Sequence, residues 1–327
     1  MINPISRRHF TTLCSGTVAS LFASCATSYP PAKAPRRVTA DVAPPPQNTR
    51  LPFGVVFRGV ERFNALVAQA QAENWAALPI GERTARVGLA LVGTPYVHYT
   101  LEIDDHIESP SVNFYGMDCW TFYETALAFS RMLRAYPGHY TPDGMLRMIE
   151  IERYRNGRCN GVYTSRMHQL EDVFDNNQAR GLGSIVTHQL GGIRVSKNVR
   201  EMQSSWRTYR YLRSDPGLLP EMARIEAHVS SLPVYYVPMG RVAGIEGGIE
   251  TGDVIAITCS DNDSYSSHVG LAVREGSVCR FMHATSRSDK GHAVCFDGRI
   301  SHYLPQKSTN TGIEVFRPRD AFQNTYA

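Results

Sequence analysis

A cysteine and two histidines are the residues of this chain whose types and positions indicate nucleophilic chemistry. Cys119 follows a turn-forming segment that ends in Asp118, the candidate N-cap, and it opens an amphipathic run that predicts a helix over 119–133. His268 and His283 lie in two later β-like runs. The thiolate is the reactive form of cysteine, and the first turn of a helix favours an anion through its partial positive charge and free N–H groups. The pattern therefore indicates a cysteine nucleophile served by a histidine base.

The two histidines are predicted to share one face of a β-hairpin. Two strand-like runs flank Glu275-Gly276, and a two-residue turn there, with glycine at positive φ, pairs Arg274 with Ser277. His268 then lies directly opposite His283, with Cβ atoms roughly 5 Å apart. A two-residue shift of this register leaves the imidazoles as diagonal neighbours on the same face. His283 is thus the candidate that orients the base.

Helical periodicity dominates the first half of the chain, and short strands dominate the second. Helices are expected within 57–92 and at 119–133, 142–155, 165–175 and 216–230. Strands are expected at 254–259, 268–274, 278–285, 293–296 and 312–316. This order predicts an α+β domain, with the nucleophile on a helix of the first half and the histidines on an antiparallel sheet or open barrel.

The charge distribution argues against a nucleic-acid-binding protein. The net charge is +4, but residues 1–50 hold six Arg or Lys and one Asp, which is 6 − 1 = +5. The remainder of the chain therefore carries 4 − 5 = −1. A nucleic-acid-binding domain is expected to show a concentrated basic face. No nucleic-acid partner is expected.

The amino terminus predicts export. Arg7-Arg8 precede an acid-free apolar stretch over 13–23, which is the pattern of a signal peptide and is too short to span a bilayer. Paired arginines occur in the twin-arginine export signal and also in general secretory signals. Cys25 ends the run Leu21-Phe22-Ala23-Ser24-Cys25, which resembles a bacterial lipobox. An ordinary signal peptide that happens to contain this cysteine is the alternative.

Three segments follow from these features. Residues 1–24 are expected to be the signal peptide, the proline-rich residues 25–50 an extended tether, and residues 51–327 a single catalytic domain. A lipid on Cys25 would anchor the protein to a membrane on the periplasmic side. Ala26 gives no aspartate-type retention signal, which favours the outer membrane in a cell with two membranes.

Metal chemistry is the main rival to thiol chemistry. The chain has 11 histidines, and five of its seven cysteines remain once Cys14 and Cys25 in the leader region are set aside. It contains neither a His-Glu-x-x-His motif nor a Cys-x-x-Cys pair, so neither a metal nor another cofactor is expected. The odd number of five indicates at least one free thiol.

The order of five motifs resembles that of the NlpC-type superfamily of papain-like bacterial cell-wall hydrolases. The motifs are Val92-Gly93-Thr94-Pro95-Tyr96, Met117-Asp118-Cys119, Thr251-Gly252-Asp253-Val254-Ile255-Ala256, Ser267-His268-Val269-Gly270-Leu271-Ala272 and Met282-His283-Ala284. Within it, the segments 118–124 and 163–168 are most similar to the N-acetylmuramoyl-L-alanine amidase-like family. The resemblance extends over roughly 85–318 and implies a papain-like fold.

This resemblance assigns roles to individual residues. It implies that Cys119 is the nucleophile, His268 the general base and His283 the third member of a Cys-His-His triad. Contacts to the substrate or the oxyanion are expected from Tyr96, Asp118, Arg166 and His168. For Arg166 and His168, which we consider as partners of substrate carboxylates, a solvated helix face is the alternative. The usual Asp-Cys-Ser-Gly pattern is changed by Trp120-Thr121, so substrate choice is expected to differ.

The expected function is hydrolysis of an amide bond in peptidoglycan or a muropeptide by an exported, monomeric enzyme. The resemblance favours the bond between N-acetylmuramic acid and L-Ala, and the bond from D-Glu to a diamino acid is the close rival. A thiol acyltransferase would use the same Cys119 and His268 but pass the acyl group to another acceptor. A non-catalytic envelope lipoprotein that binds glycan would need none of these groups.

Overall fold

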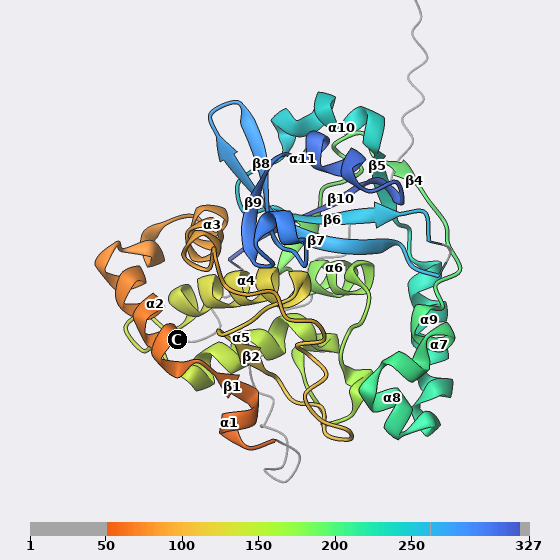
Figure 1. Cartoon of the computed structure of the whole chain (residues 1–327), viewed down its shortest axis with the longest axis horizontal. Coiled ribbons are helices and arrows are strands. Elements are labelled where there is room, and N and C mark those ends of the chain that lie inside the picture. Colours follow the sequence, from red (N-terminus) through yellow and green to blue (C-terminus); the bar gives the residue numbers. More distant parts are fainter. Residues whose placement is uncertain (1–50, 262, 321–327) are drawn as a thin grey trace, which may run out of the picture. The chain divides into compact units, whose positions relative to one another are not determined.

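The computed structural model describes residues 51–261 and 263–320, which all belong to one unit of the chain. The predicted signal peptide and tether, with Cys25, lie outside these residues. Most helices precede most strands, as the sequence predicts (Figure 1). The α-helices are α1 (Phe53–Val56), α2 (Val60–Ala72), α3 (Ile80–Ala90), α4 (Cys119–Ala135), α5 (Pro142–Arg153), α6 (Leu170–Ala179), α7 (Glu201–Ser204), α8 (Arg210–Ser214), α9 (Leu219–Ser231), α10 (Met239–Ile245) and α11 (Ile300–Tyr303). Within the described residues, no helix combines the length and apolarity that crossing a membrane requires.

An antiparallel sheet forms the centre of the second half. Its strand order is β4-β5-β10-β6-β7-β8-β9, and β3 pairs with β10. The strands of this sheet are β3 (Gly183–Ile185), β4 (Ile193–Arg194), β5 (Tyr235–Pro238), β6 (Val254–Cys259), β7 (Ser266–Glu275), β8 (Val278–Ala284), β9 (Val294–Arg299) and β10 (Asn310–Pro318). A separate parallel pair joins β1 (Phe57–Arg58) to β2 (Val112–Asn113). The observed fold is thus mixed α+β, as expected.

The sheet is covered on both faces, and this explains its apolar strands. In β6, Val254 and Ala256 face a core shared with α3 and α4, whereas Ile255 and Ile257 face a core shared with α10 and α11. Figure 1 shows α10 and α11 on one side of the sheet and α3 and α4 on the other. Strands buried on both faces carry apolar residues at successive positions instead of alternating with polar ones. The uninterrupted run 254–259 follows from this double cover.

Helix α4 is the central helix of the first half, where it packs against α3, α5 and β7. The sequence predicts one apolar stripe that includes Phe122 and Leu127, but Phe129 and Met132 are buried as well. A helix that is apolar on most of its circumference belongs in the interior of a protein. The helix that carries Cys119 is therefore held from several directions.

The β7–β8 hairpin has a register shifted by two residues from the predicted one. Glu275 pairs with Val278, so Gly276-Ser277 forms the turn, and Gly276 has φ +60° at its first central position. The glycine was correctly placed at positive φ, but the predicted pairing of Arg274 with Ser277 was wrong. His268 and His283 are consequently diagonal neighbours on one face of the sheet, the arrangement expected for a two-residue shift.

The helix predicted over 165–175 begins later than expected. Helix α6 starts at Leu170, and before it a short 3₁₀ helix over Tyr163–Ser165 is followed by extended backbone at Arg166 and Gln169. Arg166 forms a β-bridge with Tyr154, and the Met167 N–H donates to the Arg153 carbonyl at 3.0 Å. This pairing holds the segment out of the helix. Arg166 and His168 therefore do not lie on a helix face.

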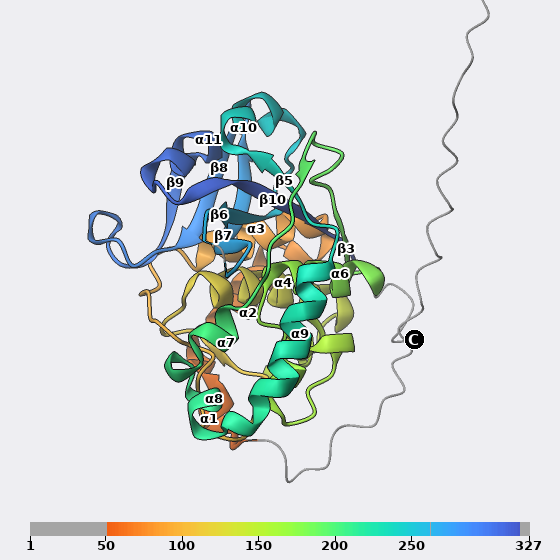
Figure 2. The same cartoon turned by 90° about the vertical axis from the view of Figure 1, so that its right-hand side faces the viewer.

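Three helices gather beside the helical layers: α9, which confirms the helix predicted over 216–230, and the much shorter α7 and α8, where no helix was predicted. Helix α9 runs alongside α7, and α8 lies near both (Figure 2). Their apolar side chains form a small core of their own, which includes Met202, Leu212 and Met222. Residues of this group line the edge of the clefts described below.

Candidate active site

Cys119 is the first residue of α4 and directly follows the N-cap residue Asp118. The Thr121 N–H donates to Asp118 Oδ1 at 2.8 Å, and the Asp118 N–H donates to Thr121 Oγ1 at 3.1 Å. This reciprocal arrangement is a capping box, with threonine in the place of the usual Glu or Gln. The predicted cap is confirmed, and it gives Thr121 a structural reason to follow the cysteine.

The second carboxylate oxygen of Asp118 is also engaged. Thr100 donates to Asp118 Oδ2 through its hydroxyl at 2.7 Å and through its backbone N–H at 3.3 Å. Both oxygens of Asp118 therefore accept hydrogen bonds from protein donors. This geometry favours a capping role over the substrate contact expected from the sequence.

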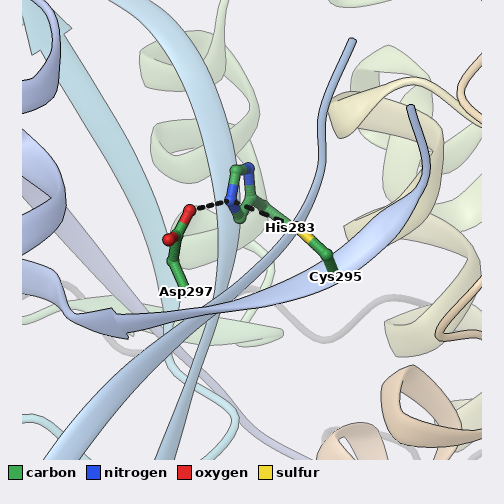
Figure 3. Close-up of side chains that lie close together, drawn as sticks. All are labelled: His283, Cys295 and Asp297. Atoms are coloured by element: carbon green, nitrogen blue, oxygen red, sulfur yellow. Dashed lines mark hydrogen bonds and ion pairs between the residues drawn. The ribbon is translucent and has the colours of Figure 1, made fainter. Parts of the chain in front are cut away.

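A chain of hydrogen bonds leads from His268 into the sheet. His268 Nε2 and His283 Nδ1 are 2.7 Å apart. His283 Nε2 lies 3.0 Å from Asp297 Oδ2 (Figure 3), and Lys290 Nζ donates to Asp297 Oδ1 at 2.6 Å. We call these four residues the relay. The structure brings the two predicted histidines into direct contact and adds a carboxylate and an ammonium group behind them.

Cys119 and His268 line the same cleft, which has a volume of about 380 Å³. The backbone N–H of Val269, the residue after His268, favours the thiolate form of Cys119 and so lowers its pKa. Helix α4 and strand β7 thus meet at the cysteine. Because Nε2 of His268 is engaged by His283, Nδ1 is the ring nitrogen that remains for the thiol.

The thiol and the imidazole are both neutral in the resting site. Burial, followed by the adjacent Asp118 charge, raises the pKa of Cys119 to about 12, and this outweighs the backbone N–H groups that lower it. Burial and the neighbouring His283 hold the pKa of His268 well below its ordinary value. The expected effect of the helix terminus is thus present, but burial outweighs it. To act as a nucleophile, Cys119 would need a base that removes its proton.

Tyr96 lies beside the nucleophile. It forms a parallel β-bridge with Met117, and its N–H donates to the His292 carbonyl at 2.7 Å. Burial raises the pKa of Tyr96, and the nearby Cys119 and Asp118 raise it further. The hydroxyl is therefore protonated at neutral pH and can donate a hydrogen bond.

Arg166 is buried and ion-paired. Its Nη2 lies 2.7 Å from Glu102 Oε1, and its Nε lies 3.5 Å from Glu108 Oε2. The guanidinium also stacks over the Tyr163 ring, with its central carbon 4.7 Å from the ring centroid. The alternative of a solvated helix face was wrong, and the two acidic partners already neutralise the charge that a substrate carboxylate would need.

His168 lies at the cleft in an uncharged form. Its Nε2 is 3.2 Å from the Tyr163 carbonyl oxygen, and the two rings pack with centroids 4.4 Å apart. Burial, with a further contribution from the Arg166 charge, holds the pKa of His168 well below its ordinary value. His168 can therefore offer a substrate a hydrogen bond but no positive charge.

A second cleft, of about 300 Å³, meets the first at the nucleophile. Cys119, Trp120 and His168 line both clefts. The second is mainly aromatic, with Tyr96, Tyr99, Trp120, Tyr163 and Tyr209 among its lining residues. The first is mainly polar, with Gln169, Glu201, Asp261, Asp263 and Ser267 among its lining residues. An extended ligand that crosses Cys119 would meet two chemically different surfaces.

Asp297 was missed by the sequence interpretation. The predicted strand over 293–296 ends one residue before it, whereas β9 continues to Arg299. Cys295 pairs with His283, so Asp297, two residues later, points to the same face of the sheet. A strand prediction extended by one residue would have placed a carboxylate beside His283.

Tyr303 was missed as well. Its ring centroid lies 5.0 Å from that of His283 and 6.0 Å from that of His268. It packs from α11, which follows β9. No sequence signal marks this tyrosine, because its contact depends on how α11 crosses the sheet.

One group of three potential metal ligands occurs within the described residues. The donor atoms of His283, Cys295 and Asp297 lie within 4.8 Å of one another (Figure 3). Lys290 and His283 already occupy the Asp297 carboxylate, and His268 occupies the other nitrogen of His283. We therefore assign His283 and Asp297 to the relay and do not assign the three residues to a metal centre.

Comparisons with known proteins identify a family and several solved structures to which the chain is similar. A family model described as AmiA-like, N-acetylmuramoyl-L-alanine amidase-like, matches residues 86–313. The chain is similar to a crystallised N-acetylmuramoyl-L-alanine amidase from Bacteroides uniformis, with 28% identity and a TM-score of 0.67 over 73% of this chain and 99% of that chain. It is also similar to a candidate xylanase from Bacteroides fragilis, with 29% identity and a TM-score of 0.63 over 71% of this chain and 99% of that chain.

A more distant structure shares only the fold. A Legionella pneumophila protein is 18% identical to this chain, with a TM-score of 0.60 over 80% of this chain and 95% of that chain. No curated protein matches the sequence. The family match at 86–313 spans more than half of the chain and contains Cys119, the two histidines and Asp297. The chain therefore belongs to the AmiA-like, N-acetylmuramoyl-L-alanine amidase-like family.

Proposed function

We propose that this protein is a cysteine amidase that hydrolyses the bond between N-acetylmuramic acid and L-Ala in peptidoglycan, on a papain-like fold of the NlpC type. The observation that carries the proposal is the position of Cys119 at the start of α4, in one cleft with His268, whose Nε2 is 2.7 Å from His283 Nδ1. A nucleophile, a base and a group that orients the base are the three parts of nucleophilic acyl transfer. The family membership supports an amide substrate.

In the first half of the reaction, His268 Nδ1 takes the thiol proton as the Cys119 sulfur attacks the carbonyl carbon. The backbone N–H of Cys119 and the Tyr96 hydroxyl are the candidate donors to the oxyanion. The C–N bond then breaks, and the leaving amine takes the proton from His268. A thioester on Cys119 and a free L-Ala amine remain.

In the second half, water replaces the amine. His268 Nδ1 removes a proton from the water as its oxygen attacks the thioester carbonyl. The C–S bond breaks, and the sulfur regains the proton from His268. The products are a glycan with a free lactyl carboxyl group and a stem peptide with a free amino terminus.

The two clefts that meet at Cys119 suit a substrate with two chemically different halves. Aromatic side chains such as Tyr99 and Trp120 offer flat surfaces to one half. Polar side chains such as Gln169 and Ser267 offer hydrogen bonds to the other. We infer that the sugar lies over the aromatic cleft and the stem peptide lies in the polar one.

Digestion of purified sacculi, followed by mass spectrometry of the products, tests the proposal. We expect the wild-type protein to release stem peptides with a free L-Ala amine and Cys119→Ala to release none. Cys279→Ala is the matched control, since it removes a thiol that lies in the sheet core outside both clefts.

Other results of this digestion would indicate a different function. Products with a free γ-glutamyl end would identify a D-glutamyl endopeptidase on the same site. Acyl transfer to an added amine in preference to water would identify an acyltransferase. Unchanged digestion by Cys119→Ala would reject the cysteine mechanism, and the absence of products from the wild type would favour a binding lipoprotein.

We also propose that the protein is exported and is attached to the periplasmic face of a membrane through a lipid on Cys25. We favour the outer membrane over the inner membrane. The lipobox-like run over 21–25 supports this proposal. Cell fractionation of the wild type and of Cys25→Ser provides the test. We expect the variant to leave the membrane fraction, and membrane association that persists in Cys25→Ser would reject the anchor.

A further inference from the structure

The carboxylate of Asp297 lies at the closed end of the relay. It is on β9, only 3% exposed, and both of its oxygens are engaged, one by His283 Nε2 at 3.0 Å and the other by Lys290 Nζ at 2.6 Å. The hydrogen bond from His283, supported by Lys290, holds the pKa of Asp297 well below its ordinary range. Asp297 is therefore ionised and can only accept hydrogen bonds.

Because Asp297 can only accept, it determines which nitrogen carries the proton in His283 and then in His268. His283 must carry a proton on Nε2 to donate to Asp297. Burial lowers the pKa of His283, so the ring is neutral and its Nδ1 is bare. The 2.7 Å contact to that bare nitrogen then requires a proton on His268 Nε2. A neutral His268 with its proton on Nε2 has a bare Nδ1.

We propose that Asp297 is a positioning residue that acts through His283 to set the tautomer of His268, so that the bare Nδ1 is the nitrogen available to the Cys119 thiol. This inference rests on the proposed function, since it assigns the base atom of that reaction. With the opposite tautomers, the 2.7 Å contact between the rings would be equally well satisfied. His268 would then carry its proton on Nδ1 and could not accept the proton of the thiol.

Packing fixes the position of the His283 ring. Its hydrogen bond to Asp297 then decides which ring nitrogen carries the proton. The Phe281 ring stacks on His283 with centroids 4.7 Å apart, and Tyr303 packs edge-on against the same imidazole. A Cβ at Gly270 would lie 2.8 Å from the His283 Cβ and 2.5 Å from the Met282 carbonyl oxygen. The sheet therefore holds His283 closely, and the identity of its Nε2 partner decides its tautomer.

Asp297→Asn in the full-length protein tests the proposal, because the side chain keeps its shape and loses its charge. An amide can donate to or accept from His283, so the tautomer is no longer fixed. We expect kcat to fall by about 10²–10⁴-fold while KM changes by less than about threefold. Asp289→Asn is the matched control, since Asp289 is an exposed carboxylate next to Lys290 in sequence and forms an ion pair with Arg287. We expect that variant to retain kcat within about threefold.

Nitrogen NMR of protein with ¹⁵N-labelled histidine provides a reading that does not depend on turnover. In the wild type we expect protons on Nε2 of both His268 and His283 and bare Nδ1 atoms. In Asp297→Asn we expect a second pattern, with Nδ1 protonated. If the wild type carries its His268 proton on Nδ1, the proposal is overturned even if the variant fails to fold.

Two further results would overturn the proposal. One is a folded Asp297→Asn protein with kcat within threefold of the wild type, and the other is a variant whose NMR pattern is that of the wild type. The proposed function fails separately, since a wild type that yields no amide products can still show the expected tautomers.

Discussion

Two buried polar systems in this protein have different architectures. In the helical half, Arg153 pairs with Glu124 at 2.7 Å, and each side chain is 1% exposed. In the sheet, His283 and Asp297 are as deeply buried, but their hydrogen bonds continue to the half-buried His268 at a cleft. The first system reaches the clefts only through Trp120, whose Nε1–H donates to Glu124 at 3.3 Å, so it ends at a group that cannot take a proton, and we call it the closed pair. The second ends at His268, whose ring can take one.

This difference distinguishes buried polar groups that stabilise the fold from buried polar groups that can take part in a reaction. A closed ion pair satisfies both partners, and removing either one leaves an uncompensated charge in the core. The relay instead satisfies every member except the last ring nitrogen, which faces the cleft. We infer that polar groups in the core of this protein act in chemistry only where such a chain ends at an accessible atom.

The largest effect is expected at the open end of the relay. His268→Ala removes the proposed base, and we expect kcat/KM to fall by about 10²–10⁴-fold with little change in the free energy of unfolding. Amidase assays and urea unfolding measure the two quantities. His302→Ala serves as the control, because this histidine is exposed on α11. Equal losses in both variants would contradict the assignment of the base.

A substitution in the closed pair is expected to lower the stability of the protein. Arg153→Met leaves Glu124 buried without its ionic partner, and we expect the free energy of unfolding to fall by about 3–5 kcal/mol. Urea unfolding measures the loss. Arg224→Met is the matched control, since the pair of Arg224 with Glu221 on α9 is exposed and should contribute less than about 1 kcal/mol. A similar small loss in both variants would remove the distinction between the two systems.

A third buried group sharpens the comparison, because it consists of acids alone. Glu314 and Glu171 are both buried, and burial is the main cause that raises the pKa of Glu314 well above its ordinary value and that of Glu171 to about 7. The folded state thus retains protons that the unfolded state releases above pH about 4.5. This stabilising contribution is complete below that pH and is lost as the pH rises through about 7.

Glu314→Gln should weaken this dependence. We expect the variant to be more stable than the wild type by roughly 1–3 kcal/mol at pH 8 and to differ little at pH 5. Urea unfolding at the two pH values gives the comparison. Equal destabilisation of the variant at pH 5 and pH 8 would contradict the assignment of this pH dependence to Glu314.

The smallest effect is expected at the cap of α4. Asp118→Asn keeps a good N-cap, so the free energy of unfolding should change by less than about 1 kcal/mol. It also removes a charge that raises the pKa of Cys119, so the thiol pKa should fall below its value of about 12. The rate of thiol alkylation against pH, with Cys119→Ala as the blank, measures the shift. An unchanged or higher thiol pKa would contradict the expected influence of Asp118.

Much of the fold was predictable from local sequence patterns. The capping residue Asp118, the start of α4 and the five predicted strands were recognisable because caps and strand alternation depend on residues close in sequence. The hairpin register was wrong because a turn at 275–276 and one at 276–277 use the same glycine. Only the packing around Gly270 and His283 distinguishes the two.

The candidate site was predictable only in part for the same reason. Cys119, His268 and His283 stand in recognisable local settings. Arg166 was assigned to a helix because its bridge to Tyr154 and its ion pair with Glu102 involve distant residues. The balance of effects on the Cys119 thiol was not predictable either, since burial in the folded structure outweighs what the helix terminus contributes.

The sequence by itself determined the order of helices and strands, the cysteine at a helix start and the two histidines on neighbouring strands. Each of these depends on side-chain periodicity or on a cap within a few residues. Only the tertiary structure decided that Asp297 and Lys290 complete the relay and that the resting thiol is neutral. Both outcomes depend on burial and on contacts between β7, β8, β9 and α4, which no local stretch of the sequence encodes.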